Sequence, residues 1–141
     1  MLYMFFNELI YNKGVQVLII FIVLDVIFGI LRAIRENKIN STIGIDGIIR
    51  KVGMMCTICV CILIDVIIDV DLIAFIPTGV KEVLGLTKLG VSGLFNALYI
   101  VFEILSIFKN MVKCKLPLPK KVQSFLEKLL KEFTSEIKDG E

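Results

Sequence analysis

The sequence predicts an all-α membrane protein with three transmembrane helices and a C-terminal cytoplasmic amphipathic helix. Hydrophobic residues make up 57% of the 141 residues, above the roughly 45–50% that is usual in soluble domains, and the mean hydropathy is +0.87. Apolar stretches long enough to cross a bilayer lie at about 15–31, 52–70 and 89–108. We expect one transmembrane domain over residues 1–115 and an amphipathic tail over 116–141.

The first predicted span, 15–31, follows a segment with one acid and one base and no small-residue cleavage site, so we expect it to stay in the mature protein. Asp25 interrupts it, and Gly29 lies one helical turn further on the same face. Gly29 and Ala33 form a pair of small residues that lets another helix approach closely. This face is a candidate helix contact.

The second predicted span, 52–70, carries Asp65 within its last turns. Small and polar residues recur at every fourth position toward Asp65, which predicts a seam along one helix face. Paired carboxylates at Asp65 and Asp69 would suit cation binding or acid–base chemistry, but acids near a membrane interface are more often structural.

The third predicted span, 89–108, gathers its polar residues on one side of the helix. They recur at steps of three and four: Ser92, Asn96, Tyr99, Glu103, Ser106 and Asn110. Because lipid cannot solvate such a stripe, it predicts either a contact with other helices or a wall that faces water. Asp25 and Glu103 lie at similar depth and would share one path or pair with Arg32, Arg50 or Lys51.

Two polar connections join the spans. The connection at 32–51 contains NSTIGIDG, whose capping residues and glycines indicate a turn followed by a helix start. In the connection at 72–88, Pro77 breaks the chain, Thr78 is placed to begin a brief helix, and Gly85 is placed to end it. Its apolar residues favour a position on the membrane surface.

The tail begins with a basic cluster that suits anionic lipid headgroups: Lys109, Lys113, Lys115, Lys120 and Lys121. Apolar residues then recur at helical spacing from Val122 to Ile137, which predicts an amphipathic helix. Most basic residues lie in the first connection and the tail. The positive-inside rule therefore predicts the bacterial cytoplasmic membrane, with the N-terminus outside and the C-terminus cytoplasmic.

Several function classes are disfavoured by the residues present. The chain has no histidine, and no serine or cysteine is followed by a suitable base, so we expect neither an enzyme nor a zinc site. The glycine-containing connection matches no nucleotide-binding fingerprint. We therefore expect no cofactor, no metal and no nucleic-acid partner.

Five segments, in order along the chain, resemble the toxin-secretion and phage-lysis holins of clostridia and their phages, most of all those encoded with the large clostridial toxins. The segments are DVIFG from Asp25, NSTIGIDGIIRKVGM from Asn40, Leu89-Gly90, EILSIFKN from Glu103, and LPLPK from Leu116. The loop motif that carries the resemblance comprises Ser41, Thr42, Gly44, Asp46, Gly47, Arg50 and Lys51.

This resemblance implies a non-enzymatic protein that forms homo-oligomers in the membrane and opens a pore or lesion for an endolysin or a large toxin. The candidate residues for a lumen or helix seam are Asp25, Gly29, Asp65, Ser92, Asn96, Tyr99, Glu103 and Ser106. The implied partners are membrane lipid, further copies of the chain, and the exported cargo. Two alternatives stay open: an antiholin, or a small ion or solute transporter built around Asp25, Asp65 and Glu103.

Overall fold

The computed structural model is a bundle of helices and describes residues 1–37, 41–83, 85, 87–116 and 119–138, with only the backbone described for 41–43, 130 and 132–138. The helices are α1 (Leu2–Tyr11), α2 (Lys13–Arg35), α3 (Ser41–Ile68), α4 (Thr78–Val83), α5 (Val91–Lys113) and α6 (Lys120–Lys138). The predicted all-α class is confirmed.

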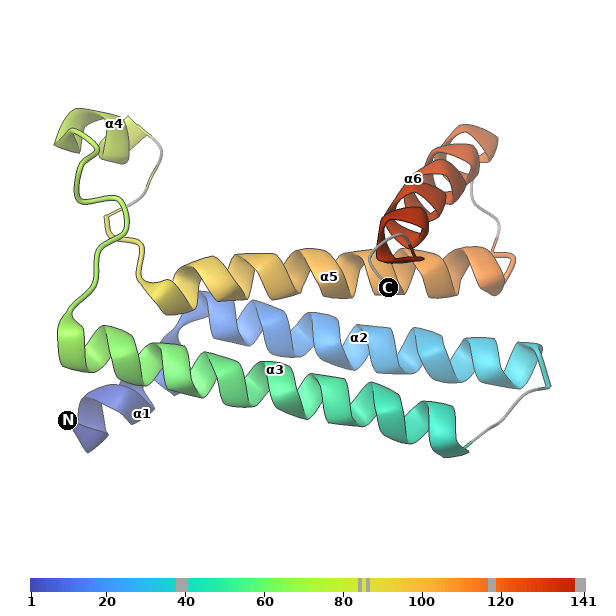
Figure 1. The fold of residues 1–141 in the computed structure, drawn as a ribbon, viewed down its shortest axis with the longest axis horizontal. Helices are drawn as coiled ribbons and strands as arrows, with labels where there is room; N and C mark the ends of the chain where they lie inside the picture. The colour runs from blue at the N-terminus through green and yellow to red at the C-terminus, as the bar shows by residue number, and fades with distance from the viewer. Residues whose placement is uncertain (38–40, 84, 86, 117–118, 139–141) are drawn as a thin grey trace.

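Three long helices lie side by side and form the body of the molecule (Figure 1). Each contains a stretch that is long and apolar enough to cross a membrane: Lys13–Arg35, Gly44–Ile68 and Val91–Lys113. Helices α2 and α5 begin at the end of the bundle where α3 finishes, and α5 packs against both of the others (Figure 1). The chain is therefore a multi-pass membrane protein with three candidate spans.

A small apolar core joins α2 to α3 in the half of the bundle nearest α1. Val15 and Leu18 of α2 meet Ile58 and Ile62 of α3, and all four are almost completely buried. Elsewhere the long helices keep large apolar side chains exposed, such as Ile20 at 57%. An exposed apolar surface of this kind is expected where the solvent is lipid, because lipid does not drive apolar side chains inward.

The second span begins earlier than predicted, and this overturns the interpretation of residues 41–51 as a connection. Helix α3 starts at Ser41 rather than near Val52, so the NSTIGIDG motif from Ser41 onward is helical. No proline interrupts the segment, and its glycines at 44 and 47 weaken a helix without ending it. The turn instead follows Glu36, where Asn37 adopts a positive φ of 51°, which asparagine tolerates better than most residues.

The other two spans also extend beyond their predicted bounds. Helix α2 begins at Lys13 because the Asn12 side chain caps it, with Oδ1 accepting hydrogen bonds from the backbone N–H groups of Gly14 at 2.9 Å and Val15 at 3.3 Å. Helix α5 continues to Lys113, five residues past the predicted end at 108. The short helix α1 before Asn12 was not predicted.

The smaller helices lie at the periphery of the bundle (Figure 1). Helix α4 begins at Thr78 after Pro77 and is followed by Gly85 at φ 66°, so the predicted brief helix is confirmed. Helix α6 confirms the predicted C-terminal helix and packs against α5. Leu126 of α6 is 3% exposed, whereas Phe125 beside it is 62% exposed.

Candidate functional site

The candidate functional site is a charged cluster, defined by Asp25, Lys51 and Glu103, in which each of the three long helices supplies one residue. The Lys51 Nζ atom of α3 lies 2.8 Å from Asp25 Oδ2 of α2 and 2.6 Å from Glu103 Oε2 of α5. The side chain of Lys51 is only 13% exposed, that of Asp25 11% and that of Glu103 4%. One ammonium group thus links all three candidate spans.

Asn110 extends the charged cluster toward the loop end of α2. Its Nδ2 donates to Asp25 Oδ1 at 3.0 Å, and its Oδ1 accepts from Arg32 Nη1 at 3.4 Å. A side chain added at Gly29 would approach Asn110 Nδ2 to 3.8 Å, an ordinary contact distance. Gly29 therefore lies beside Asn110 of α5, and its role as a helix contact stays a prediction.

The charge balance makes this cluster energetically sensitive. Two carboxylates share one ammonium ion in a region with little solvent access, so the desolvation of all three groups opposes their mutual attraction. A buried ion pair adds little net stability, but removing one partner leaves a buried charge and costs about 3–5 kcal/mol. The arrangement is therefore sensitive to the loss of any one of its three charges.

The remaining stripe on α5 also faces the inside of the bundle. Ser92 and Asn96 are 7% and 2% exposed, and Tyr99 and Ser106 are half-buried. Tyr99 packs against the apolar core. Within one chain, the stripe thus contacts other helices, which was one of its two predicted environments.

Both polar atoms of the Asn96 amide, Oδ1 and Nδ2, are buried and have no hydrogen-bond partner among the described residues. It lies against the start of α2, where a side chain added at Gly14 would come within 3.4 Å of Asn96 Nδ2. An unpaired buried amide destabilises a fold by about 1–3 kcal/mol. The bundle holds this polar group at an energetic penalty.

Asp65 has a structural role at the end of the bundle where α3 finishes and α5 begins. Its carboxylate accepts hydrogen bonds from the backbone N–H groups of Val91 at 2.8 Å and Ser92 at 2.9 Å, and so caps α5 from another helix. Gly90 is the N-cap residue of α5, and a Cβ atom there would collide with the Asp65 carboxylate. Glycine at 90 therefore permits the cap.

Asp71 links the two ends of the connection between α3 and α5 by hydrogen bonds. Its carboxylate accepts from the backbone N–H groups of Ile73 and Leu89 and from Lys81 Nζ at 3.1 Å. Desolvation raises the pKa of Asp71, but the hydrogen bonds from Leu89, Lys81 and Ile73 outweigh it, so the pKa lies below its usual value. Nearby, the hydrogen bond to Asp69 raises the pKa of Lys88 despite opposing desolvation.

The predicted site residues therefore fall into two separate groups. Asp25 and Glu103 meet at Lys51, whereas Asp65 lies 14 positions beyond Lys51 on α3, roughly 21 Å away at about 1.5 Å per residue. The structure therefore does not bring Asp65 together with Asp25 and Glu103. Of the loop motif, Lys51 reaches the cluster and Arg50 and Asp46 are exposed, while the side chains of Ser41 and Thr42 lie outside the described residues.

The basic residues of the tail remain outside this interior network. Each of them is exposed: Lys109, Lys113, Lys115, Lys120 and Lys121. They surround the end of α5 that carries Asn110 and the start of α6. Their placement suits the predicted contact with anionic headgroups, which stays a prediction.

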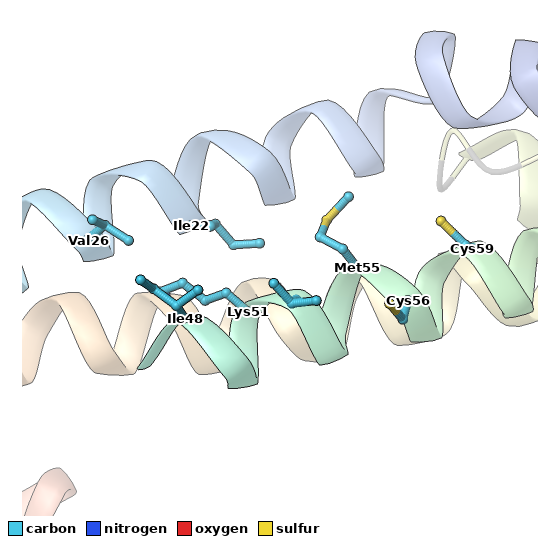
Figure 2. A pocket seen from close by; sticks show the side chains of 8 residues that line it. Ile22, Val26, Ile48, Lys51, Met55, Cys56 and Cys59 are labelled. Carbon is cyan, nitrogen blue, oxygen red and sulfur yellow. The ribbon is translucent and has the colours of Figure 1, made fainter. Parts of the chain in front are cut away.

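An open apolar groove of about 600 Å³ separates α2 from α3 beside the charged cluster (Figure 2). Ile22 and Val26 line it from α2, and Met55, Cys56 and Cys59 line it from α3, with Lys51 at one end (Figure 2). All four cysteines are free thiols. In the part of the chain that the structure describes, no cluster of His, Cys, Asp or Glu is arranged to hold a metal ion.

The sequence alone predicts Lys51 in a connection, where it is one of three basic residues that could pair with Asp25 and Glu103. Asn110 was recognised as part of the stripe but not as a site residue. Asn110 lies seven residues after Glu103, and residues seven apart share a helix face. This spacing is the sequence signal that places Asn110 and Glu103 in one site.

Comparisons with known proteins agree with this architecture. The Bacteriophage holin family matches residues 3–131. The chain is 38% identical over 133 residues to the holin-like protein TcdE of Clostridioides difficile, covering 94% of this chain and 78% of that protein. It is also 28% identical over 108 residues to an uncharacterised protein of Halalkalibacterium halodurans, covering 77% and 71% of the two chains.

No solved structure matches the chain significantly. The family match covers most of the sequence, and it includes all three long helices and the residues of the charged cluster. The chain therefore belongs to the bacteriophage holin family, whose members are non-enzymatic membrane proteins.

Proposed function

We propose that this protein is a holin that forms homo-oligomers in the bacterial cytoplasmic membrane and opens pores or lesions for an endolysin or a large toxin. The observation that carries the proposal is the charged cluster of Asp25, Lys51 and Glu103 inside three candidate spans. Ionisable groups inside a membrane are expensive to hold, and they usually mark a path or an assembly contact.

The single-chain bundle is, in this proposal, the closed form. Its polar stripe is turned inward, and the Lys51 ammonium neutralises part of the charge of Asp25 and Glu103. When chains assemble, the stripe on α5 exchanges its intramolecular neighbours for other chains or for water. Because hydrogen bonds between helices in membranes are individually weak, about 0.6–2 kcal/mol, such an exchange is energetically accessible.

The orientation in this proposal is N-out and C-in. It rests on the exposed basic residues near the end of α5 and in the tail, together with Arg35 at the end of α2 and Arg50 in the first half of α3, which are also exposed. In this orientation the charged cluster lies near the middle of the bundle, with Asp25 ten residues before the end of α2 and Glu103 ten residues before the end of α5. The hydrogen bonds that Asp71 accepts in the connection between α3 and α5 lie at the outer end of the bundle.

Expression in a bacterium tests the function. We expect abrupt loss of viability with release of a cytoplasmic reporter larger than about 50 kDa, the size of a domain too big for a transporter. Ion flux without release of the reporter would support a transporter instead, and inhibition of another holin without lysis would support an antiholin. Co-expression with an endolysin or with a large toxin identifies which cargo crosses.

The variant Glu103→Leu tests whether the charged cluster matters for this function. We expect altered lysis timing and altered assembly on crosslinking, because the variant leaves Lys51 with one carboxylate. Phe102→Leu is the matched control, since Phe102 is the adjacent residue and 46% exposed. Unchanged timing and assembly in Glu103→Leu would remove the cluster from the mechanism.

A further inference from the structure

We propose that α1 is an interfacial helix that docks on the lipid bilayer through a stripe formed by Leu2, Phe6 and Ile10, with its opposite side toward water. The partner of this apolar stripe is lipid, which the stripe contacts at the boundary between headgroups and acyl chains. The proposal does not depend on lesion formation, because it concerns how the folded chain lies in the membrane.

Packing of α1 on the bundle leaves this stripe free. Phe5 and Leu9 point inward and pack against the apolar core. Leu2, Phe6 and Ile10 are spaced four residues apart, so they lie along one side of the helix. They are 72%, 49% and 57% exposed.

The side of α1 away from the stripe carries the only charged and amide side chains of this helix, Asn7 and Glu8, beside Met4. Asn7 and Glu8 line a hollow of about 510 Å³ between α1, the end of α3 and the start of α5. Asp65, Asp69 and Lys88 line the same hollow. Charged and amide groups of this kind require water or polar partners, so this side of α1 marks the aqueous edge of the bundle.

The connection to α2 keeps α1 at the membrane boundary. Helix α1 ends at Tyr11 and the candidate span begins at Lys13, with only Asn12 between them. In Figure 1, α1 lies beside the end of the bundle where α3 finishes, at an angle to the long helices. An amphipathic helix at such a position buries its apolar side about 5–10 Å into the headgroup–acyl boundary.

The size of the stripe favours lipid over a second copy of the chain. Three side chains offer far less than the roughly 800 Å² per partner that a stable protein interface buries. A bilayer needs no shape complementarity, only exposed apolar surface next to a polar side. Aromatic residues are also enriched at this depth in membranes, and Tyr3 at the edge of the stripe is 82% exposed.

Single-tryptophan fluorescence tests the proposal, because the chain contains no tryptophan. Phe6→Trp places the probe in the stripe, and Tyr11→Trp places it on the same side as Asn7, four residues before it. Each full-length variant is reconstituted in vesicles of phosphatidylethanolamine and phosphatidylglycerol containing phosphatidylcholine brominated near the headgroup. Iodide is supplied on both sides of the membrane as the aqueous quencher.

We expect brominated lipid to quench most of the emission of Phe6→Trp and iodide to quench little of it. For Tyr11→Trp we expect strong quenching by iodide and weak quenching by brominated lipid. Protection of Phe6→Trp from both quenchers would mean that protein covers the stripe, and iodide quenching of both variants would mean that α1 lies in water. Either result overturns the proposal, as does bromine quenching of both variants alike. Ile10→Trp repeats the test if Phe6→Trp does not fold.

Discussion

Replacing Lys51 by methionine should destabilise the bundle more than any other single change to a cation. In the structure the Lys51 ammonium lies 2.8 Å from Asp25 and 2.6 Å from Glu103. Without it, the two carboxylate oxygens that now contact Lys51 Nζ, which these distances place at most about 5 Å apart, repel each other by at least about 3 kcal/mol at an effective dielectric constant of about 20. Loss of one partner from a buried charge pair costs a similar amount, about 3–5 kcal/mol.

The assay is equilibrium unfolding of the purified protein in mixed detergent micelles, followed by circular dichroism. Lys51→Met should lower the free energy of unfolding by about 3–5 kcal/mol. Lys109→Met is the matched control, because Lys109 is exposed on α5, and it should change the free energy by less than about 0.5 kcal/mol.

A triple variant separates repulsion from loss of packing. Adding Asp25→Asn and Glu103→Gln to Lys51→Met removes the uncompensated charges, so most of the lost stability should return. A loss below about 1 kcal/mol in Lys51→Met, the size expected of an exposed ion pair, would refute the reasoning. It would mean that water screens the cluster.

Three further changes probe other parts of the molecule. Asp65→Ala removes the cap from α5 and should lower the free energy of unfolding by about 0.5–2 kcal/mol, with faster hydrogen exchange of the first α5 amides. Asn96→Leu removes the unpaired amide and should raise the free energy of unfolding by about 1–3 kcal/mol; loss of stability in both Asn96→Leu and Asn96→Val would show that the amide is satisfied. The pKa of Asp71 is lowered in the folded chain, so its contribution is present above the unfolded pKa of about 3.9 and is lost as pH falls through the folded value. Proteolysis of the connection should therefore accelerate at acidic pH in the native chain, and Asp71→Asn should already be cleaved rapidly at neutral pH.

Local sequence patterns were sufficient to predict every described helix except α1, but not all of the helix bounds. Apolar length predicts each span, since a bilayer-crossing segment must satisfy its own backbone hydrogen bonds as a helix. The start of α3 was misplaced because polar residues and glycines at 41–51 resemble a connection, although nothing there prevents a helix. Helix α1 was missed because its ten residues are too few to cross a bilayer and precede the first apolar span.

The sequence by itself determined that polar residues on α5 share one side, and that Asp25 and Glu103 lie at similar depth. Both follow from helical periodicity and rise, which are properties of a single segment. Only the tertiary structure decided the partners: Lys51 joins the two acids, Asn110 bonds Asp25, and Asp65 caps α5. Such pairings depend on the rotation and spacing of neighbouring helices, and periodicity within one helix carries no information on either.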